Sequence, residues 1–229
     1  MTEPEDMLQG PPPTEPPRER RRQAAERRIL DAARSILLEG TSVDALSLRE
    51  VARRADFTPG ALYRYFDDRT DLIATLFREA GARLGAALGT ALPAAPGAAD
   101  VACLRAVGLA YLQFSREHPE DLMLLFQHNA RVATWQEYVT LAWPFSMVVQ
   151  AVEAGAGRGL LALPPGLDAA GTAYAFWSLL HGMTELRRTH LRDVRGDFES
   201  MERAALAALT AGFEPLEDVP HATPTGGPR

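Results

Sequence analysis

The side chains best suited to binding a charged partner gather in one short segment, residues 58–65. This segment carries hydroxyl groups and a guanidinium, and it contains no carboxylate. Hydroxyls and guanidiniums donate hydrogen bonds to phosphate oxygens, and an arginine can pair with both acceptors of a guanine edge. A helix that presents such groups and is braced across a second helix suits the major groove of DNA. The segment therefore predicts a DNA-contacting helix.

Two short helices joined by a tight turn would position this segment. The first begins after Ser47 and has Glu50 three residues on, which is the pattern of a capping box. The turn falls at residues 56–57. The second helix begins at Thr58, which is expected to cap it, and Pro59 suits the first helical position because its missing N–H costs little there. This pattern is typical of a helix-turn-helix.

The stretch around the turn, LSLREVARRADFTPGALYRYFDDRTDL, resembles the N-terminal domain of the TetR family of bacterial transcriptional regulators. That family's pattern ends in Gly-x-Leu-Tyr-x-His-Phe, with a lysine and a leucine at the next helix. Four residues match it: Gly60, Leu62, Tyr63 and Phe66. Four depart from it: Tyr65 replaces the usual His, Arg69 the Lys, Thr58 the Ser and Asp56 the turn Gly. Because Asp tolerates a left-handed backbone better than most residues, the turn is expected to survive.

The resemblance implies that the helix after the turn enters the major groove while the preceding two helices brace it. Its candidates for contact with base edges are Pro59, Gly60, Ala61 and Arg64. Its candidates for phosphate contacts, which set register without reading sequence, are Thr58, Tyr63 and Tyr65. Further backbone contacts are expected from Ser47, Arg49 and Arg69. Leu62 and Phe66 would belong to the core.

Several of these residues allow a plainer interpretation. Tyr63 and Tyr65 could be ordinary packing residues. An arginine run could be a minor-groove arm or a solvated helix start: Arg18, Arg20, Arg21 and Arg22. Four other arginines are expected to be surface charges: Arg27, Arg28, Arg53 and Arg54.

The distribution of charge agrees with a DNA-facing N-terminal half. The chain carries a formal charge of −6, yet residues 18–70 hold 12 Arg against 9 acids. The flanking segments are both acidic. The only basic part of the chain is thus the part with the helix-turn-helix pattern.

Composition also indicates the cellular compartment of the protein. The single cysteine, Cys103, cannot form an intrachain disulfide, which favours a reducing environment. The sequence shows neither a long apolar run nor the pattern of a signal peptide. We therefore expect a cytoplasmic protein that does not enter a membrane.

The apolar spacing is helical throughout, so the expected fold is all-α. The resemblance implies a three-helix helix-turn-helix domain followed by a helical bundle for ligand binding and dimerisation. The proline-rich ends, residues 1–17 and 214–229, read as a disordered leader and tail. The expected domains are residues 18–70 and 71–213. The expected helices cover about residues 18–39, 48–55, 58–66, 67–88, 98–117, 119–128, 135–154, 167–190 and 197–213, and the 135–154 helix is expected to be kinked or interrupted at Pro144.

The C-terminal half contains FSREHPEDLMLLF and FWSLLHGMTEL, which resemble the TetR subgroup named for a Trp-His-Gly signature, here Trp177, His181 and Gly182. A member of that family would sense an effector with these helices. The apolar composition favours a small apolar or aromatic molecule with few polar anchors. The candidate ligand-binding residues are Tyr111, Phe114, Phe126, His128, Trp143, Met147, Gln150, Tyr174, Trp177 and His181. Simple core packing is the alternative for the apolar members, and a structural role is the alternative for His181.

The last two helices are rich in small residues, and one face carries Phe198, Met201, Ala205, Ala208, Leu209 and Gly212. The resemblance implies that they form a four-helix interface in a homodimer, which would match a palindromic operator in double-stranded DNA. A repressor released by its effector is the expected function. An activator or a regulator controlled by a protein partner is the alternative.

An enzyme and a helical adaptor that never touches DNA are more remote alternatives. The sequence lacks the nucleophile elbow, the HExxH zinc motif and the Walker A loop. GAGRG at residues 155–159 follows a predicted helix and not a strand, so it is a weak nucleotide-binding signal. With one cysteine and scattered histidines, no metal site, cofactor or catalytic residue is expected.

Overall fold

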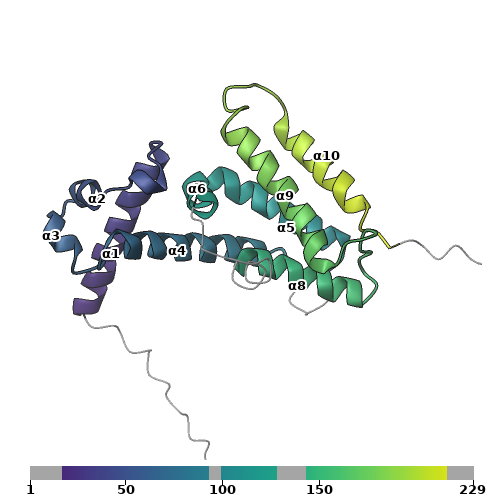
Figure 1. Cartoon of the computed structure of the whole chain (residues 1–229), viewed down its shortest axis with the longest axis horizontal. Coiled ribbons are helices and arrows are strands. Elements are labelled where there is room, and N and C mark those ends of the chain that lie inside the picture. Colours follow the sequence, from purple (N-terminus) through teal and green to yellow (C-terminus); the bar gives the residue numbers. More distant parts are fainter. Residues whose placement is uncertain (1–16, 93–98, 128–142, 216–229) are drawn as a thin grey trace, which may run out of the picture. The chain divides into compact units, whose positions relative to one another are not determined.

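The computed structural model describes residues 17–92, 99–127 and 143–215, and all regular structure in these ranges is helical (Figure 1). The all-α fold class is therefore confirmed. Contacts between residues divide the chain into a first unit, residues 1–76, and a second unit, residues 77–229. The division falls within one long helix. The finer domain bounds drawn from the sequence stay a prediction.

The first unit contains a helix-turn-helix and its supports. Its elements are α1 (Pro17–Leu38), the 3-10 helix η1 (Val43–Ala45), α2 (Leu48–Arg54), α3 (Pro59–Leu62) and the beginning of α4 (Arg69–Gly89). α2 packs on both α1 and α3. The apolar side chains at helical spacing meet in a buried core: Ile29, Ala33, Ile36, Val51, Leu62, Phe66 and Leu72. The predicted core positions of Leu62 and Phe66 are confirmed.

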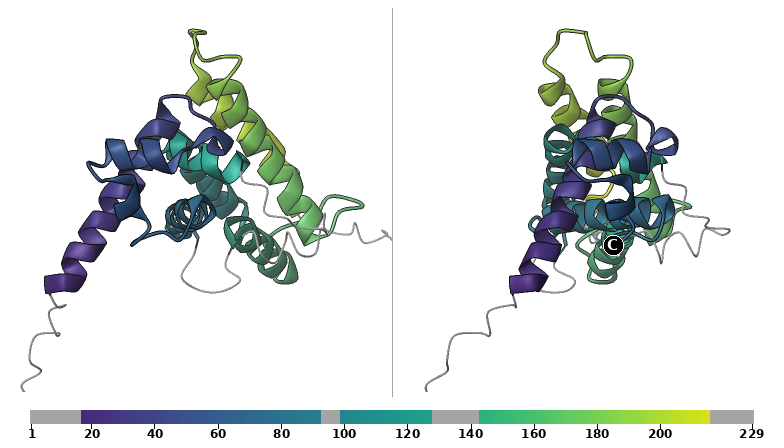
Figure 2. Two further views of the ribbon diagram at one scale, coloured as in Figure 1. Left: turned by 60° about the vertical axis from the view of Figure 1, so that its left-hand side comes forward. Right: turned by 90° about the vertical axis from the view of Figure 1, so that its left-hand side faces the viewer.

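The second unit is a helical bundle. Beyond the rest of α4 it contains α5 (Val101–Glu117), α6 (Pro119–Gln127), α8 (Trp143–Gly157), α9 (Ala169–Arg188) and α10 (Phe198–Ala211). α9 packs on α5, α8 and α10, and α9 and α10 run side by side in the views of Figure 1 and Figure 2. Three of these helices begin at an aspartate whose side chain accepts a backbone N–H of the first turn: Asp100, Asp168 and Asp197.

The close approach of α5 to α10 depends on one glycine. A Cβ at Gly108 would lie 2.7 Å from Cδ2 of Leu206 and 3.2 Å from Cζ of Phe176. Because the surrounding side chains are fully buried, any larger residue at this position would push the helices apart.

Three local expectations need correction: the end of the helix after the turn and the two N-caps. The α-helix after the turn ends at Leu62, and the chain continues through residues 63–65 in turns held by i→i+3 bonds. Ser47 and Thr58 occupy the N-cap positions, but neither side chain makes a capping hydrogen bond. Pro144 lies in the first turn of α8, and the residues before Trp143 lie outside the described part of the chain, so the kink or interruption expected at Pro144 stays a prediction. The start of the expected 135–154 helix lies outside the described residues.

Candidate nucleic-acid interface and effector domain

A left-handed residue and a clamping arginine shape the helix-turn-helix turn. Asp56 has φ of 58°, the only positive φ at a non-glycine residue in the described ranges. The expectation that aspartate accepts the usual glycine's place is thus confirmed. Arg28 of α1 donates from Nη2 to the Ala55 carbonyl at 2.9 Å and lies 3.5 Å from Asp56 Oδ2. Its guanidinium also lies 5.3 Å from the centre of the Phe57 ring.

The segment after the turn presents its polar side chains to solvent. Tyr63 is 59 % exposed, and Arg64, Thr58 and Pro59 are exposed as well. Tyr65 is half-buried and packs edge-on against Phe57, with ring centroids 5.8 Å apart. Tyr65 therefore contributes to packing, whereas Tyr63 does not, and contact of either tyrosine with a phosphate stays a prediction.

The fold of the protomer does not require a glycine at position 60. Gly60 is exposed, its φ is not positive, and a Cβ built on it meets no atom within 4 Å. Neither the backbone conformation nor the packing of the protomer explains a glycine here. A close approach of another molecule to this backbone would explain it.

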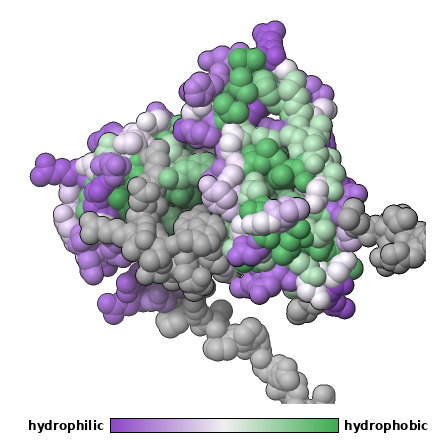
Figure 3. Space-filling model, turned by 45° about the vertical axis from the view of Figure 1, so that its right-hand side comes forward, coloured by the Kyte–Doolittle hydropathy of each residue, from purple (hydrophilic) through white to green (hydrophobic). Residues whose placement is uncertain are grey.

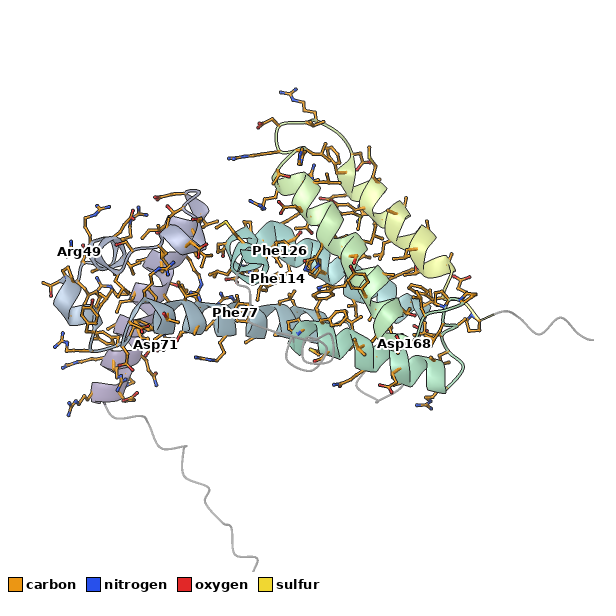
Figure 4. The ribbon with its side chains drawn as sticks, in the orientation of Figure 1. Arg49, Asp71, Phe77, Phe114, Phe126 and Asp168 are labelled. Atoms are coloured by element: carbon orange, nitrogen blue, oxygen red, sulfur yellow. The ribbon has the colours of Figure 1, made fainter. Side chains whose placement is uncertain are left out.

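Arg69 is committed to the protein itself. Its Nε donates to the Leu46 carbonyl at 2.8 Å and its Nη2 donates to the Val43 carbonyl at 2.6 Å. These bonds fix the start of α4 to the end of η1. Contact between Arg69 and a phosphate stays a prediction, and it would have to use the remaining nitrogen. Ser47 and Arg49 are exposed at the start of α2, where Figure 4 shows Arg49.

Two of the arginines expected to be surface charges are structural. Arg28 holds the turn, and Arg54 makes two hydrogen bonds to Glu39, of 2.7 and 2.8 Å, and one of 3.0 Å to Ser35 Oγ. The Arg54 hydrogen bonds lower the pKa of the Glu39 carboxyl. The sequence could not reveal these roles because their partners lie 15 to 29 residues away.

In the second unit, three of the candidate ligand-binding residues meet around a fourth, His181. The His181 ring lies 4.5 Å from Phe126, 5.1 Å from Trp177 and 5.5 Å from Tyr111, measured between centroids. His181 Nδ1 lies 3.1 Å from the Trp177 carbonyl oxygen and 3.3 Å from Tyr111 Oη. Burial lowers the pKa of His181 to about 4, so the ring is neutral at pH 7. Because a carbonyl oxygen can only accept, the contact with Trp177 favours the tautomer that carries its proton on Nδ1.

The other candidates lie elsewhere. Tyr174 is 57 % exposed and Gln150 is exposed, so neither lines the core of the protomer. Phe114 is buried, but its ring contacts His118 at 4.9 Å and not His181 (Figure 4 labels Phe114 and Phe126). Met147 is half-buried on α8. His128 and the Trp143 side chain lie outside the described residues.

A buried ion pair joins α4 to α6 within the second unit. Arg83 donates from Nε to Asp121 Oδ2 at 2.6 Å and from Nη2 to Oδ1 at 2.5 Å. The Asp121 side chain is 0 % exposed. Ligand atoms of His118, Glu120 and Asp121 lie within 4.8 Å of one another, but a guanidinium holds both Asp121 oxygens, which opposes a metal ion there.

Among the described helices, none combines the length and the hydropathy that crossing a bilayer requires.

The sequence matches two family profiles. Bacterial regulatory proteins of the tetR family match residues 29–76, and the tetracyclin repressor-like C-terminal domain matches residues 104–213. The second match does not confirm the Trp-His-Gly subgroup, which stays a prediction. No curated protein matches the chain significantly.

Solved structures share the fold over most of the chain. A protein of unknown function from Rhodococcus sp. RHA1 is 27% identical, with a TM-score of 0.66 over 83% of this chain and 95% of that one. A tetR-family regulatory protein from Rhodococcus RHA1 is 20% identical, with a TM-score of 0.62 over 84% and 98%. AibR, solved with isovaleryl coenzyme A and operator DNA, is 15% identical, with a TM-score of 0.63 over 81% and 98%. Because both halves match and together span more than half of its length, the chain belongs to the TetR family of transcriptional regulators.

Proposed function

We propose that the protein is a repressor that binds a palindromic operator as a homodimer and leaves it when a small apolar effector binds the second unit. The observation that carries the proposal is the exposed segment after the turn, which offers hydroxyls and a guanidinium on a braced helix-turn-helix. In this proposal Arg64 reads a base edge, and Thr58 and Tyr63 hold phosphates.

The test is a footprint on the DNA upstream of the protein's own gene, followed by gel shifts in a salt series. Sequence-specific binding should produce a two-fold symmetric protected site. Its affinity should fall by roughly 0.9 log units per log unit of salt for each phosphate neutralised. A protein that protects no fragment at low ionic strength would be an adaptor of the same fold and not a regulator.

Gly60 provides a prediction that separates DNA contact from folding. Gly60→Ala should leave the unfolding midpoint unchanged or slightly higher, because the Cβ meets nothing and alanine favours helix by about 1 kcal/mol. Operator affinity should nevertheless fall about tenfold or more, since the methyl would hold the backbone away from the groove. Gly157→Ala is the control, because its Cβ also meets no atom within 4 Å. Equal operator binding by both variants would remove Gly60 from the interface.

The proposed dimer face lies on α9 and α10. On α9, side chains at four-residue spacing are all exposed: Tyr174, Ser178, Gly182 and Leu186. On α10, Met201, Ala204, Ala208 and Gly212 are exposed. Figure 3 shows apolar residues over much of the right-hand face, where these helices lie. The face proposed here differs from the one expected from the sequence. Phe198, Ala205 and Leu209 are not part of it, because they are half-buried against the protomer itself.

Gly182 tests this dimer. A Cβ there meets no atom within 4 Å of the protomer, so Gly182→Glu should fold as well as the parent chain. In a two-fold interface the same position occurs on both copies, so the change would introduce two carboxylates into a close helix contact. We expect sedimentation to show a dimer for the parent and mostly monomer for the variant. Gly157→Glu on α8 should stay dimeric, and an unchanged mass for Gly182→Glu would exclude this face.

The effector proposal rests on the apolar surroundings of His181, where Tyr111, Phe126 and Trp177 meet. A protein of the same fold, AibR, was solved with both an acyl thioester and operator DNA. A panel of apolar acids, aromatics and acyl thioesters added to the operator gel shift is the test. Linkage between the two sites should change DNA affinity by about 1–3 kcal/mol for the true effector. Deleting the gene should raise target transcription for a repressor and lower it for an activator.

A further inference from the structure

A hollow at one end of the second unit has a composition unlike the apolar cluster around His181. Its volume is about 260 Å³, and it lies where α5 and α9 end and α6 and α10 begin. Its charged lining consists of Arg116, Arg187, Arg188 and Glu202. Because two helices end here and two begin, their backbone dipoles largely offset each other, and the side chains decide the sign of the potential.

The arginines outnumber the carboxylates available to them. Arg188 is neutralised by Glu185, which accepts two hydrogen bonds of 3.0 and 2.8 Å. Arg116 and Arg187 share Glu202, at 3.2 and 3.8 Å. One carboxylate therefore faces two guanidiniums. Burial raises the pKa of Glu202, and the two arginines oppose that rise.

Arg187 has donors to spare. Its guanidinium stacks on the Phe198 ring, with Cζ 4.2 Å from the ring centre. Stacking directs the five N–H groups outward in the guanidinium plane, where they suit a bidentate oxyanion. The 3.8 Å separation from Glu202 is an ion pair and too long for a hydrogen bond. No hydrogen bond from Arg187 to another described residue is formed.

A second, independent observation concerns Thr184, which also lines the hollow. Thr184 is only 6 % exposed, and its hydroxyl has no hydrogen-bond partner among the described residues. A buried hydroxyl without a partner is costly, so its place in the lining of the hollow suits a site that a bound ligand or ion completes. Thr184 lies one helical turn before Arg187 and Arg188, so all three belong to one side of α9.

We propose that Arg116, Thr184 and Arg187 form a binding site for a small oxyanion, a phosphate or carboxylate group. The two guanidiniums supply charge and in-plane donors, and the threonine hydroxyl supplies a third donor. The hollow is smaller than the roughly 300–1,000 Å³ of sites for drug-sized ligands, so it suits a free anion or the anionic end of a larger molecule. The site is separate from the aromatic cluster around His181 and does not depend on DNA binding.

The test uses the full chain labelled with ¹⁵N-arginine and follows the Nε–H signals by NMR. Inorganic phosphate and acetate are titrated separately, with chloride adjusted to hold ionic strength constant. A site of this kind should give saturable shifts of the Arg116 and Arg187 signals with Kd of about 1 mM or below. The stronger of the two probes identifies the class of anion. Shifts that do not saturate, or that affect all exposed arginines equally, would overturn the proposal.

Three variants of the site and one control variant make the outcome specific. Arg187→Gln should weaken the affinity about tenfold or more, because a charge-assisted hydrogen bond is lost. Glu202→Gln should tighten binding several-fold, because the anion no longer competes with an internal carboxylate. Thr184→Val keeps the shape of the side chain and should weaken binding several-fold. Arg78→Gln, an exposed arginine of α4 outside the hollow, removes the same charge and should change nothing. Weaker binding by Glu202→Gln, or unchanged binding by Arg187→Gln, would show that the anion is held elsewhere.

Discussion

Replacing Tyr63 and Arg64 together by alanine should lower operator affinity about 100-fold or more while leaving the fold intact. A bidentate arginine–guanine pair contributes about 1–3 kcal/mol, and a hydrogen bond to a phosphate contributes about 1.5–3 kcal/mol. The lower values sum to about 2.5 kcal/mol, which is roughly 60-fold, and values in the middle of the two ranges exceed 100-fold. Tyr63 is 59 % exposed and Arg64 is exposed, so the free energy of unfolding should change by less than about 1 kcal/mol.

The measurement is a gel shift on the footprinted site, with circular dichroism to verify folding. Arg53→Ala is the matched control, because Arg53 is also exposed and its loss removes the same charge from α2. A general electrostatic effect would weaken both proteins equally. A double variant that still binds within tenfold of the parent would place the DNA contact on another surface.

The second large effect concerns stability and the buried pair between α4 and α6. Arg83→Met should reduce the free energy of unfolding of the second unit by about 3 kcal/mol, because it takes the guanidinium from a carboxylate that is 0 % exposed. Asp121→Ala should cost less, since Arg83 is 35% exposed and can turn toward water. Because the two side chains differ in exposure, we also predict the order of the two effects: Arg83→Met should destabilise the second unit more than Asp121→Ala.

Urea denaturation followed by tryptophan fluorescence measures the free energy of unfolding of the second unit, because all three tryptophans lie in that unit: Trp135, Trp143 and Trp177. Arg188→Met is the control. Arg188 and Glu185 also form two hydrogen bonds, but both side chains are well exposed, so the loss should be about 1 kcal/mol or less. Equal losses in the two methionine variants would mean that burial does not strengthen the α4–α6 pair.

Local signals in the sequence predicted the helices well. Prolines, aspartates and glycines at the ends of apolar runs indicated most boundaries to within a few residues, and Asp56 adopts the left-handed turn that the pattern required. The helix after the turn was predicted too long. Residues 63–65 continue in turns held by i→i+3 hydrogen bonds, and the side-chain spacing in such turns is close to that of an α-helix. The capping box was wrong because Ser47 has a capping residue's position without its hydrogen bond.

The sequence did not indicate which residues far apart in the chain would contact each other. Arg69 appeared to be a phosphate ligand by its place in the motif, yet its known partners are two backbone carbonyls more than 20 residues away. Tyr174 was grouped with the apolar residues of α9, but which face of a helix is buried depends on how its neighbours pack. The pairing of Arg83 with Asp121 spans 38 residues and has no local signature.

The three contacts of Arg28 affect how an alanine scan of the basic residues should be interpreted. This arginine holds a carbonyl, a carboxylate and a ring at three consecutive turn residues, so its loss would loosen the segment that carries Tyr63 and Arg64. Such a scan would score Arg28 as a DNA contact although the side chain serves the turn. Only the ionic-strength slope distinguishes the two roles, because a scaffold residue releases no counterions when the complex forms.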